Sequence, residues 1–365
     1  MYKQIFLDAP LIGEQEKEYL ARAIDQGYVS TAGPFVPEFE QKFARYLNAG
    51  KAVSTQSGTA AIHVSLCELG IGPGDEVIVP ALTFVASVNP VKYAGATPVF
   101  ADVEPDTWDI SPAEIKKCIT SRTKAIIPVH LYGNPCRMEE INAIAAEHGL
   151  YVIEDATESL GATVSGRYTG TLGDFGCFSF NGNKLITTGG GGAVTGRNAG
   201  SLDHIKFLVN QARDESRGYY HPEIGFNYRM TNLEAAMGLA QMDRLGGFLE
   251  KKRSFSRMYR EQLKGLGAFQ QEAEGAASAF WLTAMVLNEG VRPEALQKGL
   301  SERGIQTRRI FMPVPEFPPY AKYSSGPFPN SYAIYERGLC LPSSPRNTEE
   351  DIYSVCDAIK GLLSR

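Results

Sequence analysis

Apolar runs alternate with segments of helical periodicity between residues 51 and 195. The runs are nearly continuous, without polar alternation, and lie at 51–55, 76–79, 98–101, 125–129 and 151–155. Strands that are buried on both faces and separated by helices predict a largely parallel sheet, covered by helices on both sides. Because ligands of such sheets bind at the carboxyl ends of the strands, we expect the chemistry of this chain just after each run.

The pattern changes after residue 176. Two strands, at 178–180 and 192–195, are expected to flank a glycine-rich loop, and residues 230–264 predict one long helix or a pair. We expect the charged part of this helix, 250–264, to be a solvated face. The remainder predicts a strand at 281–286, a helix near 293–303, a proline-rich loop and a last helix at 349–363.

These elements predict two domains within 365 residues. The first, residues 1–245, would hold an N-terminal arm and the large sheet. The second, residues 246–365, would be a small α+β domain. The predicted fold class is therefore α/β, with a mostly parallel mixed sheet sandwiched by helices and a smaller C-terminal domain.

Composition excludes several classes of protein. A net charge of −5 with 43% apolar residues is typical of a globular protein and argues against a nucleic-acid binder. The longest apolar run, 77–91, is too short for a membrane span, and the N-terminus has no secretory pattern. Six scattered cysteines and five histidines without ligand spacing predict a cytoplasmic protein with no metal site.

Three segments carry candidate chemistry. The first is Ser57-Gly58-Thr59, between a strand and a helix. Ser57 is a good N-cap, and the start of a helix offers unpaired N–H groups that suit a phosphate. Gly58 would let the backbone approach a ligand closely. When this segment is taken alone, an ordinary capped turn explains it fully.

The second segment is Glu154-Asp155-Ala156-Thr157-Glu158, at the end of the strand at 151–155. A carboxylate at this position points into the ligand crevice and could pair with a protonated ring nitrogen through a charge-assisted hydrogen bond. The alternative is an acidic residue that stabilises the first turn of a helix.

The third segment places Lys184 between the apolar run 178–180 and four glycines, 189–192. A partly desolvated lysine can form a Schiff base with an aldehyde. The glycines would let the chain pass close to a planar group. The alternative is a surface lysine on a flexible hairpin.

Taken together, the three segments supply a phosphate-binding turn, a carboxylate and a lysine in this order. Pyridoxal phosphate (PLP) needs these three groups, so we predict a PLP enzyme.

The chain resembles the DegT/DnrJ/StrS family of PLP-dependent nucleotide-sugar aminotransferases, which have fold type I like aspartate aminotransferase. The similarity covers nearly the whole chain, and the ordered set of motifs is highly specific. The motifs are Gly33-Pro34-Phe35-Val36, Ser57-Gly58-Thr59, residues 80–87 (PALTFVAS), His130-Leu131-Tyr132-Gly133, Glu154-Asp155-Ala156, residues 178–184 (FSFNGNK) and residues 225–230 (GFNYRM).

This resemblance implies roles for the catalytic residues. Lys184 would carry the cofactor as a Schiff base and then shuttle a proton between the amino donor and the cofactor. Asp155 would pair with the pyridinium nitrogen. Glu158, where many relatives have Gln, would hydrogen-bond the phenolic oxygen of PLP.

The resemblance also implies the residues that bind the cofactor. Gly58, Thr59 and Ser179 would bind its phosphate, and Phe84 would stack on its ring. Asn227 would reach the phosphate held by the neighbouring subunit, which implies a homodimer with two shared sites.

The predicted reaction moves an amino group from L-glutamate to C4 of a nucleotide-linked 4-keto-6-deoxyhexose. The context of Lys184 resembles that of the 4-aminotransferases, which make precursors of sugars such as bacillosamine, perosamine or legionaminic acid. Among these, we expect a UDP-4-keto-6-deoxy-GlcNAc type of substrate, as in bacillosamine or legionaminic-type pathways for surface polysaccharides. The alternatives are GDP-4-keto-6-deoxymannose, as for perosamine, and a 3-ketosugar. Relatives often carry Trp, His and Gln where this chain has Phe311, Pro315 and Phe317, so its sugar pocket is expected to differ from theirs.

Other readings remain open. A lyase or desulfurase would need a nucleophilic cysteine, for which only Cys136 and Cys177 are nearby. A non-catalytic protein of this fold would have lost the lysine or the aspartate, and both are present. Four further side chains either contact a substrate or make structural hydrogen bonds: His130, Tyr228, Arg229 and Arg308. Both tryptophans, Trp108 and Trp281, are expected to pack in the core.

Overall fold

Seven strands form the central sheet of the computed structural model, which describes residues 3–364. In spatial order they are β1 (Ala52–Thr55), β9 (Gly192–Gly196), β8 (Phe175–Ser179), β5 (Tyr151–Asp155), β4 (Thr123–Ile126), β2 (Glu76–Pro80) and β3 (Thr97–Ala101). Within this sheet β9 runs antiparallel to both of its neighbours, and the other four pairs are parallel. The structure thus confirms the mostly parallel mixed sheet.

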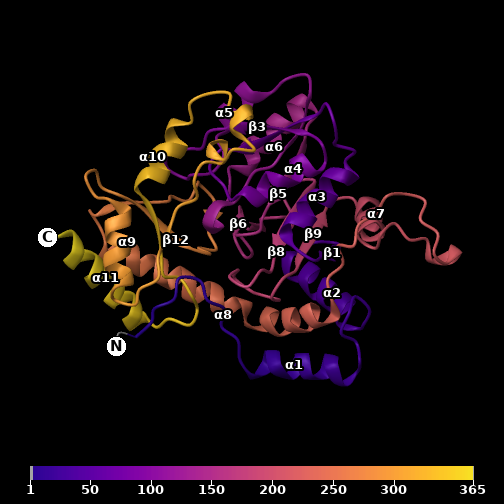
Figure 1. The fold of residues 1–365 in the computed structure, drawn as a ribbon, viewed down its shortest axis with the longest axis horizontal. Helices are drawn as coiled ribbons and strands as arrows, with labels where there is room; N and C mark the ends of the chain where they lie inside the picture. Colours follow the sequence, from indigo (N-terminus) through magenta and orange to yellow (C-terminus); the bar gives the residue numbers. More distant parts are fainter. Residues whose placement is uncertain (1–2, 365) are drawn as a thin grey trace.

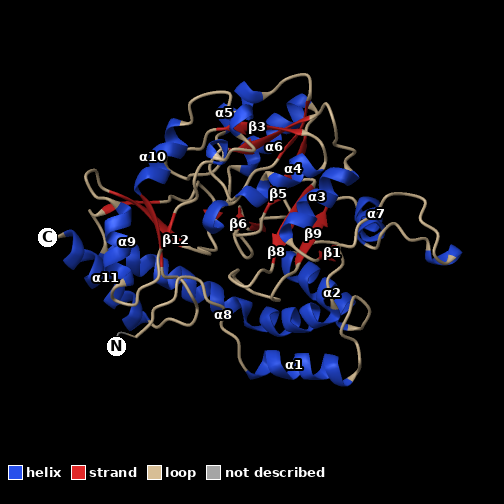
Figure 2. Cartoon of the chain, viewed as in Figure 1, coloured by secondary structure: helices blue, strands red, loops and turns tan. Residues whose placement is uncertain are grey.

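Helices cover both faces of this sheet (Figure 2). Val77 and Val79 of β2 point into an apolar cluster with α3 (Gly58–Glu68), α4 (Asn89–Tyr93) and α7 (Ala199–Val209). Ile78, between them, points to the opposite face and packs with α5 (Pro112–Cys118) and α6 (Met138–His148). That face continues under α2 (Phe35–Leu47) and α8 (Asn232–Gln262). Burial on both faces explains why the strands read as unbroken apolar runs.

A second sheet lies toward the C-terminus (Figure 1). Its antiparallel strands, in spatial order, are β10 (Gly267–Phe269), β12 (Thr283–Leu287), β14 (Gly338–Leu341) and β13 (Arg308–Arg309). Two helices, α9 (Pro293–Ser301) and α11 (Glu349–Leu363), share an apolar cluster with this sheet and with the end of α8. The helix α10 (Pro329–Arg337) precedes β14.

Shorter elements complete the fold. The helix α1 (Glu14–Asp25) lies along α8 (Figure 1). Three two-residue strands form a small sheet: β6 (Thr163–Val164), β7 (Arg167–Tyr168) and β11 (Ala276–Ala277). The 3-10 helices are η1 (Val85–Ser87), η2 (Leu131–Gly133), η3 (Glu215–Arg217), η4 (Val314–Glu316) and η5 (Ala321–Tyr323). Within residues 3–364, no helix combines the length and the apolar character needed to cross a membrane.

One helix, α8, links the two sheets. It runs unbroken for 31 residues from the side of the large sheet to the small one (Figure 1). A capping box starts it, in which Thr231 and Glu234 satisfy each other's backbone N–H groups. The domain boundary predicted between residues 245 and 246 falls inside this helix, so the division into two domains stays a prediction. The expectation of a solvated face at 250–264 is wrong for one side of the helix, where Lys252, Phe255 and Tyr259 are buried.

Candidate active site

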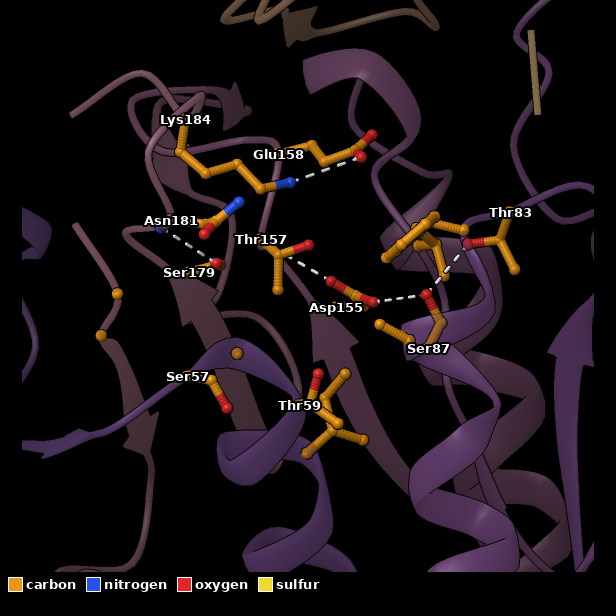
Figure 3. A pocket seen from close by; sticks show the side chains of 17 residues that line it. Ser57, Thr59, Thr83, Ser87, Asp155, Thr157, Glu158, Ser179, Asn181 and Lys184 are labelled. Atoms are coloured by element: carbon orange, nitrogen blue, oxygen red, sulfur yellow. Dashed lines mark hydrogen bonds and ion pairs between the residues drawn. The ribbon is translucent and has the colours of Figure 1, made fainter. Parts of the chain in front are cut away.

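A cavity of about 220 Å³ opens at the carboxyl ends of the parallel strands (Figure 3). Its wall contains seven of the eight site residues that the sequence predicts: Gly58, Thr59, Phe84, Asp155, Glu158, Ser179 and Lys184. The eighth, Asn227, is exposed and lies outside this set. Asn227 forms an isolated β-bridge with Asn210, which caps the end of α7, and follows the loop that extends beyond α7 (Figure 1).

The start of α3 forms one end of the cavity. The side chain of Ser57 accepts a hydrogen bond from the N–H of Ala60 at 3.1 Å, as an N-cap should. The N–H groups of Gly58 and Thr59, in the first turn, have no acceptor within the helix. A Cβ atom at Gly58 would come within 2.8 Å of Thr157 Cγ2 and 2.9 Å of Ser179 Cβ. Only a glycine therefore leaves the backbone open to an anion such as the cofactor's phosphate.

Asp155 lies at the end of β5 and is 3% exposed. Its Oδ2 accepts a 2.6 Å hydrogen bond from Ser87 Oγ, and its Oδ1 accepts from the N–H of Thr157 at 3.1 Å. Ser87 is in turn within 2.9 Å of Thr83 Oγ1 (Figure 3). No Lys, Arg or His among residues 3–364 forms an ion pair with this carboxylate. A buried carboxylate with no cation of its own fits the protonated ring nitrogen of PLP.

Lys184 reaches into the cavity from the loop after β8, opposite Asp155 (Figure 3). Its Nζ lies 3.5 Å from Glu158 Oε1, and its side chain is 13% exposed. The other oxygen of Glu158 accepts a 2.8 Å hydrogen bond from the N–H of Tyr132. Burial raises the pKa of Glu158, whereas the Lys184 ammonium acts in the opposite direction. A lysine amine thus faces the same cavity as the phosphate cradle and the buried carboxylate, which is the donor set that PLP requires.

Aromatic rings border the lysine. Phe84 is 52% exposed, so its ring is free to stack on a planar ligand, and its centroid lies 5.5 Å from that of Phe311. The indole of Trp281 lies under Lys184, with 4.1 Å between Nζ and the ring centroid. Trp281 is buried, as the sequence predicts, but the contact with Lys184 was not predicted.

Sequence reasoning missed several wall residues. Ser87, which orients Asp155, lies inside the motif at 80–87 and could have been found as a polar residue at a strand end. Thr157 and Asn181 adjoin predicted site residues in the same way. Trp281, which contacts Lys184 but does not line the cavity, gave no signal, because nothing near it in the sequence points to the lysine almost a hundred residues earlier.

Two of the further candidates have structural partners. His130 is fully buried, accepts from the N–H of Cys136 at 3.0 Å and lies 3.0 Å from Glu154. Tyr228 Oη lies 3.0 Å from His63 Nδ1.

Arg308 also has a structural partner, Asp8, with 3.4 Å between its Nη1 and the carboxylate Oδ2. Its guanidinium lies over the rings of Trp281 and Phe311, each with 5.4 Å between Cζ and the ring centroid. Arg229 has a buried Nε without a hydrogen-bond partner among the described residues.

The cysteine alternative fails on the environment of its thiols. Cys136 and Cys177 are both buried, and burial raises the pKa of each thiol well above its usual value. A thiol in such a setting does not supply a reactive thiolate.

The fold and this cavity define an aminotransferase of the PLP-dependent α/β class. The chain belongs to the DegT/DnrJ/EryC1/StrS aminotransferase family, whose model matches residues 10–360. It is 39% identical to GDP-perosamine synthase of Escherichia coli O157:H7, covering 99% of both chains. It is 41% identical to GDP-perosamine synthase of Caulobacter vibrioides, covering 99% of this chain and 98% of the relative. The PLP form of Spr1654 from Streptococcus pneumoniae has the same fold (TM-score 0.93, 26% identity, covering 100% and 99%). The protein is therefore a nucleotide-sugar aminotransferase that depends on PLP.

Proposed function

We propose that the protein transfers an amino group from L-glutamate to C4 of GDP-4-keto-6-deoxymannose. The observation that carries this substrate is the full-length similarity, at 39% and 41% identity, to two GDP-perosamine synthases. These relatives support the GDP-linked alternative better than the UDP-4-keto-6-deoxy-GlcNAc type that we expected first. The product would be a 4-amino-4,6-dideoxy sugar for a surface polysaccharide.

The cavity residues divide the work between them. Bound PLP supplies an aldehyde that takes up an amino group and a ring that withdraws electrons from the neighbouring carbon. Lys184 would hold the cofactor as a Schiff base and, once its amine is free, would move the proton between donor and acceptor carbons. Asp155 would keep the ring nitrogen protonated, and Glu158 would hydrogen-bond the phenolic oxygen.

The remaining roles concern binding. Gly58, Thr59 and Ser179 would hold the phosphate, and Phe84 would stack on the ring. The same cavity would have to accept L-glutamate and the ketosugar one after the other.

We further propose a homodimer in which Asn227 completes the partner's site. Asn227 is exposed and is not among the residues that line its own chain's cavity, and the segment 210–230 carries exposed apolar side chains at Tyr219 and Ile224. Exposed apolar residues on an extended segment are typical of a surface that is covered by another chain.

The experiment is a substrate panel with purified protein, PLP and L-glutamate. GDP-4-keto-6-deoxymannose should be aminated, with NMR placing the new amine at C4, and Lys184→Ala should abolish turnover. Preferential turnover of the UDP-linked 4-ketosugar would restore the first prediction, and an amine at C3 would identify a 3-ketosugar enzyme. Undiminished turnover by Lys184→Ala would refute the whole mechanism.

A further inference from the structure

Trp281 contacts both Lys184 and the residue before it. The face of the indole lies 4.1 Å from Lys184 Nζ, well inside the range of a cation–π interaction. The indole N–H donates a 2.7 Å hydrogen bond to the main-chain carbonyl of Asn183, the residue before the lysine. One side chain thus holds both the ammonium group and the backbone from which the lysine side chain starts.

Trp281 is itself firmly held. It is 2% exposed and stacks on Tyr132, with 6.3 Å between ring centroids and 23° between ring planes. Its main-chain carbonyl accepts a 2.8 Å hydrogen bond from Lys252 Nζ, which makes a second 2.8 Å bond to the carbonyl of Ser343. Since α8, η2 and the segment after β14 all contribute, the indole is a fixed surface against which Lys184 packs.

We propose that Trp281 is a positioning residue that holds the amine of Lys184 whenever this amine is not bound to the cofactor. The proposal rests on the PLP site described above. The free ammonium would sit between the indole face and Glu158 Oε1, where the structure has it. Without this surface, the four-carbon side chain of Lys184 would sample many rotamers while its amine is free, which is when this amine has to move a proton.

The contact has a thermodynamic consequence. When PLP binds covalently, the amine nitrogen of Lys184 adds to the aldehyde carbon and one water leaves, so the ammonium has to abandon the indole. Pyridoxamine phosphate has no aldehyde and leaves the amine where it is. Trp281 should therefore favour pyridoxamine phosphate over PLP, which eases release of the lysine once the amino group is on the cofactor.

The test compares dissociation constants of PLP and pyridoxamine phosphate for the apoprotein, with no donor or sugar present. In Trp281→Leu the ratio Kd(PLP)/Kd(pyridoxamine phosphate) should fall about three- to thirty-fold, the range that a cation–π contact predicts. Trp281→Phe keeps a weaker aromatic face and should give a smaller fall. Trp108→Phe, in the same apolar cluster, should leave the ratio unchanged and controls for damage to packing.

An equal change in both constants would overturn the proposal, because packing alone affects the two ligands alike. Absence of any lysine-dependent PLP absorption band in the wild type would instead refute the cofactor site. A second measurement covers the case in which Trp281→Leu does not fold. Trp108→Phe leaves Trp281 as the single tryptophan, and its emission in the apoprotein should change when Lys184→Met is added. Identical spectra would contradict the contact.

Discussion

Ser87 Oγ and Asp155 Oδ2 are joined by a 2.6 Å hydrogen bond that connects η1 to the end of β5. The same carboxylate accepts the N–H of Thr157 with its other oxygen. Both oxygens are thereby oriented before any ligand arrives, and the carboxylate does not have to reorganise when a protonated ring nitrogen approaches.

Asp155→Asn and Ser87→Ala should both weaken the cofactor site, but the first should do so more strongly. Asp155→Asn replaces the charge and should lower kcat at least about 100-fold, because an amide does not keep the ring nitrogen protonated. Ser87→Ala leaves the charge but frees its rotamer, and should cost about tenfold, in line with a hydrogen bond to a charged group. Steady-state kinetics at saturating PLP measures both. Ser65→Ala, a buried hydroxyl that bonds within α3, is the control; equal losses in Ser87→Ala and Ser65→Ala would contradict the assignment.

Gly58 should not tolerate a side chain. In Gly58→Ala the new methyl group would meet Thr157 and Ser179 at less than 3 Å, so the start of α3 would have to shift. We expect PLP affinity, measured by absorbance titration, to fall at least about tenfold while the protein stays folded. Gly246→Ala in α8, where a methyl group meets nothing within 4 Å, is the matched control. If Gly58→Ala bound PLP as tightly as the wild type, the phosphate of the cofactor would not be bound at this position.

The sequence predicted the elements whose signals are local. The helix at 138–148 and the strand at 151–155 have the predicted bounds. Their signals are local: the apolar periodicity of the helix, the apolar run of the strand and the carboxylates at its end all lie within a short stretch of sequence. The antiparallel direction of β9 was not predicted, since it depends on pairing between β1 and β8. Burial of Lys252 was missed for the same reason: its partners, the carbonyls of Trp281 and Ser343, lie 29 and 91 residues away. The motifs that carry the chemistry could be predicted from the sequence, whereas the residues that hold them in place could not.

Lys252 should give the protein a distinctive pH dependence of stability. Burial lowers its pKa from 10.5 to about 7. Between these two values the folded chain binds fewer protons than the unfolded chain, so the lysine's contribution to the free energy of unfolding rises with pH. Below pH 7 both states are protonated, and the full cost of burying the charge applies.

Comparison with Lys252→Met isolates this contribution. Denaturant unfolding of the apoprotein at pH 6.5 and pH 9 should show the wild type gaining free energy of unfolding relative to the variant, by up to about 1.4 kcal/mol per pH unit. Lys116→Met, at an exposed lysine, should run parallel to the wild type. If the free energy of unfolding of Lys252→Met changed between the two pH values by as much as that of the wild type, the buried amine would not titrate in this range.

Asn227 offers a test of shared active sites that does not need a structure of the dimer. If Asn227 serves the partner's cofactor while Lys184 serves its own, then Asn227→Ala and Lys184→Ala damage different sites. Each variant alone should be nearly inactive. A mixed dimer, however, pairs the intact Lys184 of one chain with the intact Asn227 of the other, and so contains one complete site. Random co-assembly should recover about a quarter of wild-type activity, since half of the dimers are mixed and each has one working site.

Co-expression of Lys184→Ala with Asp155→Asn is the control, because both residues line the same chain's cavity and no complete site can form. No recovery in the test pair would show that Asn227 does not serve the partner's site. Recovery in the control pair would show that Lys184 and Asp155 do not belong to the same site.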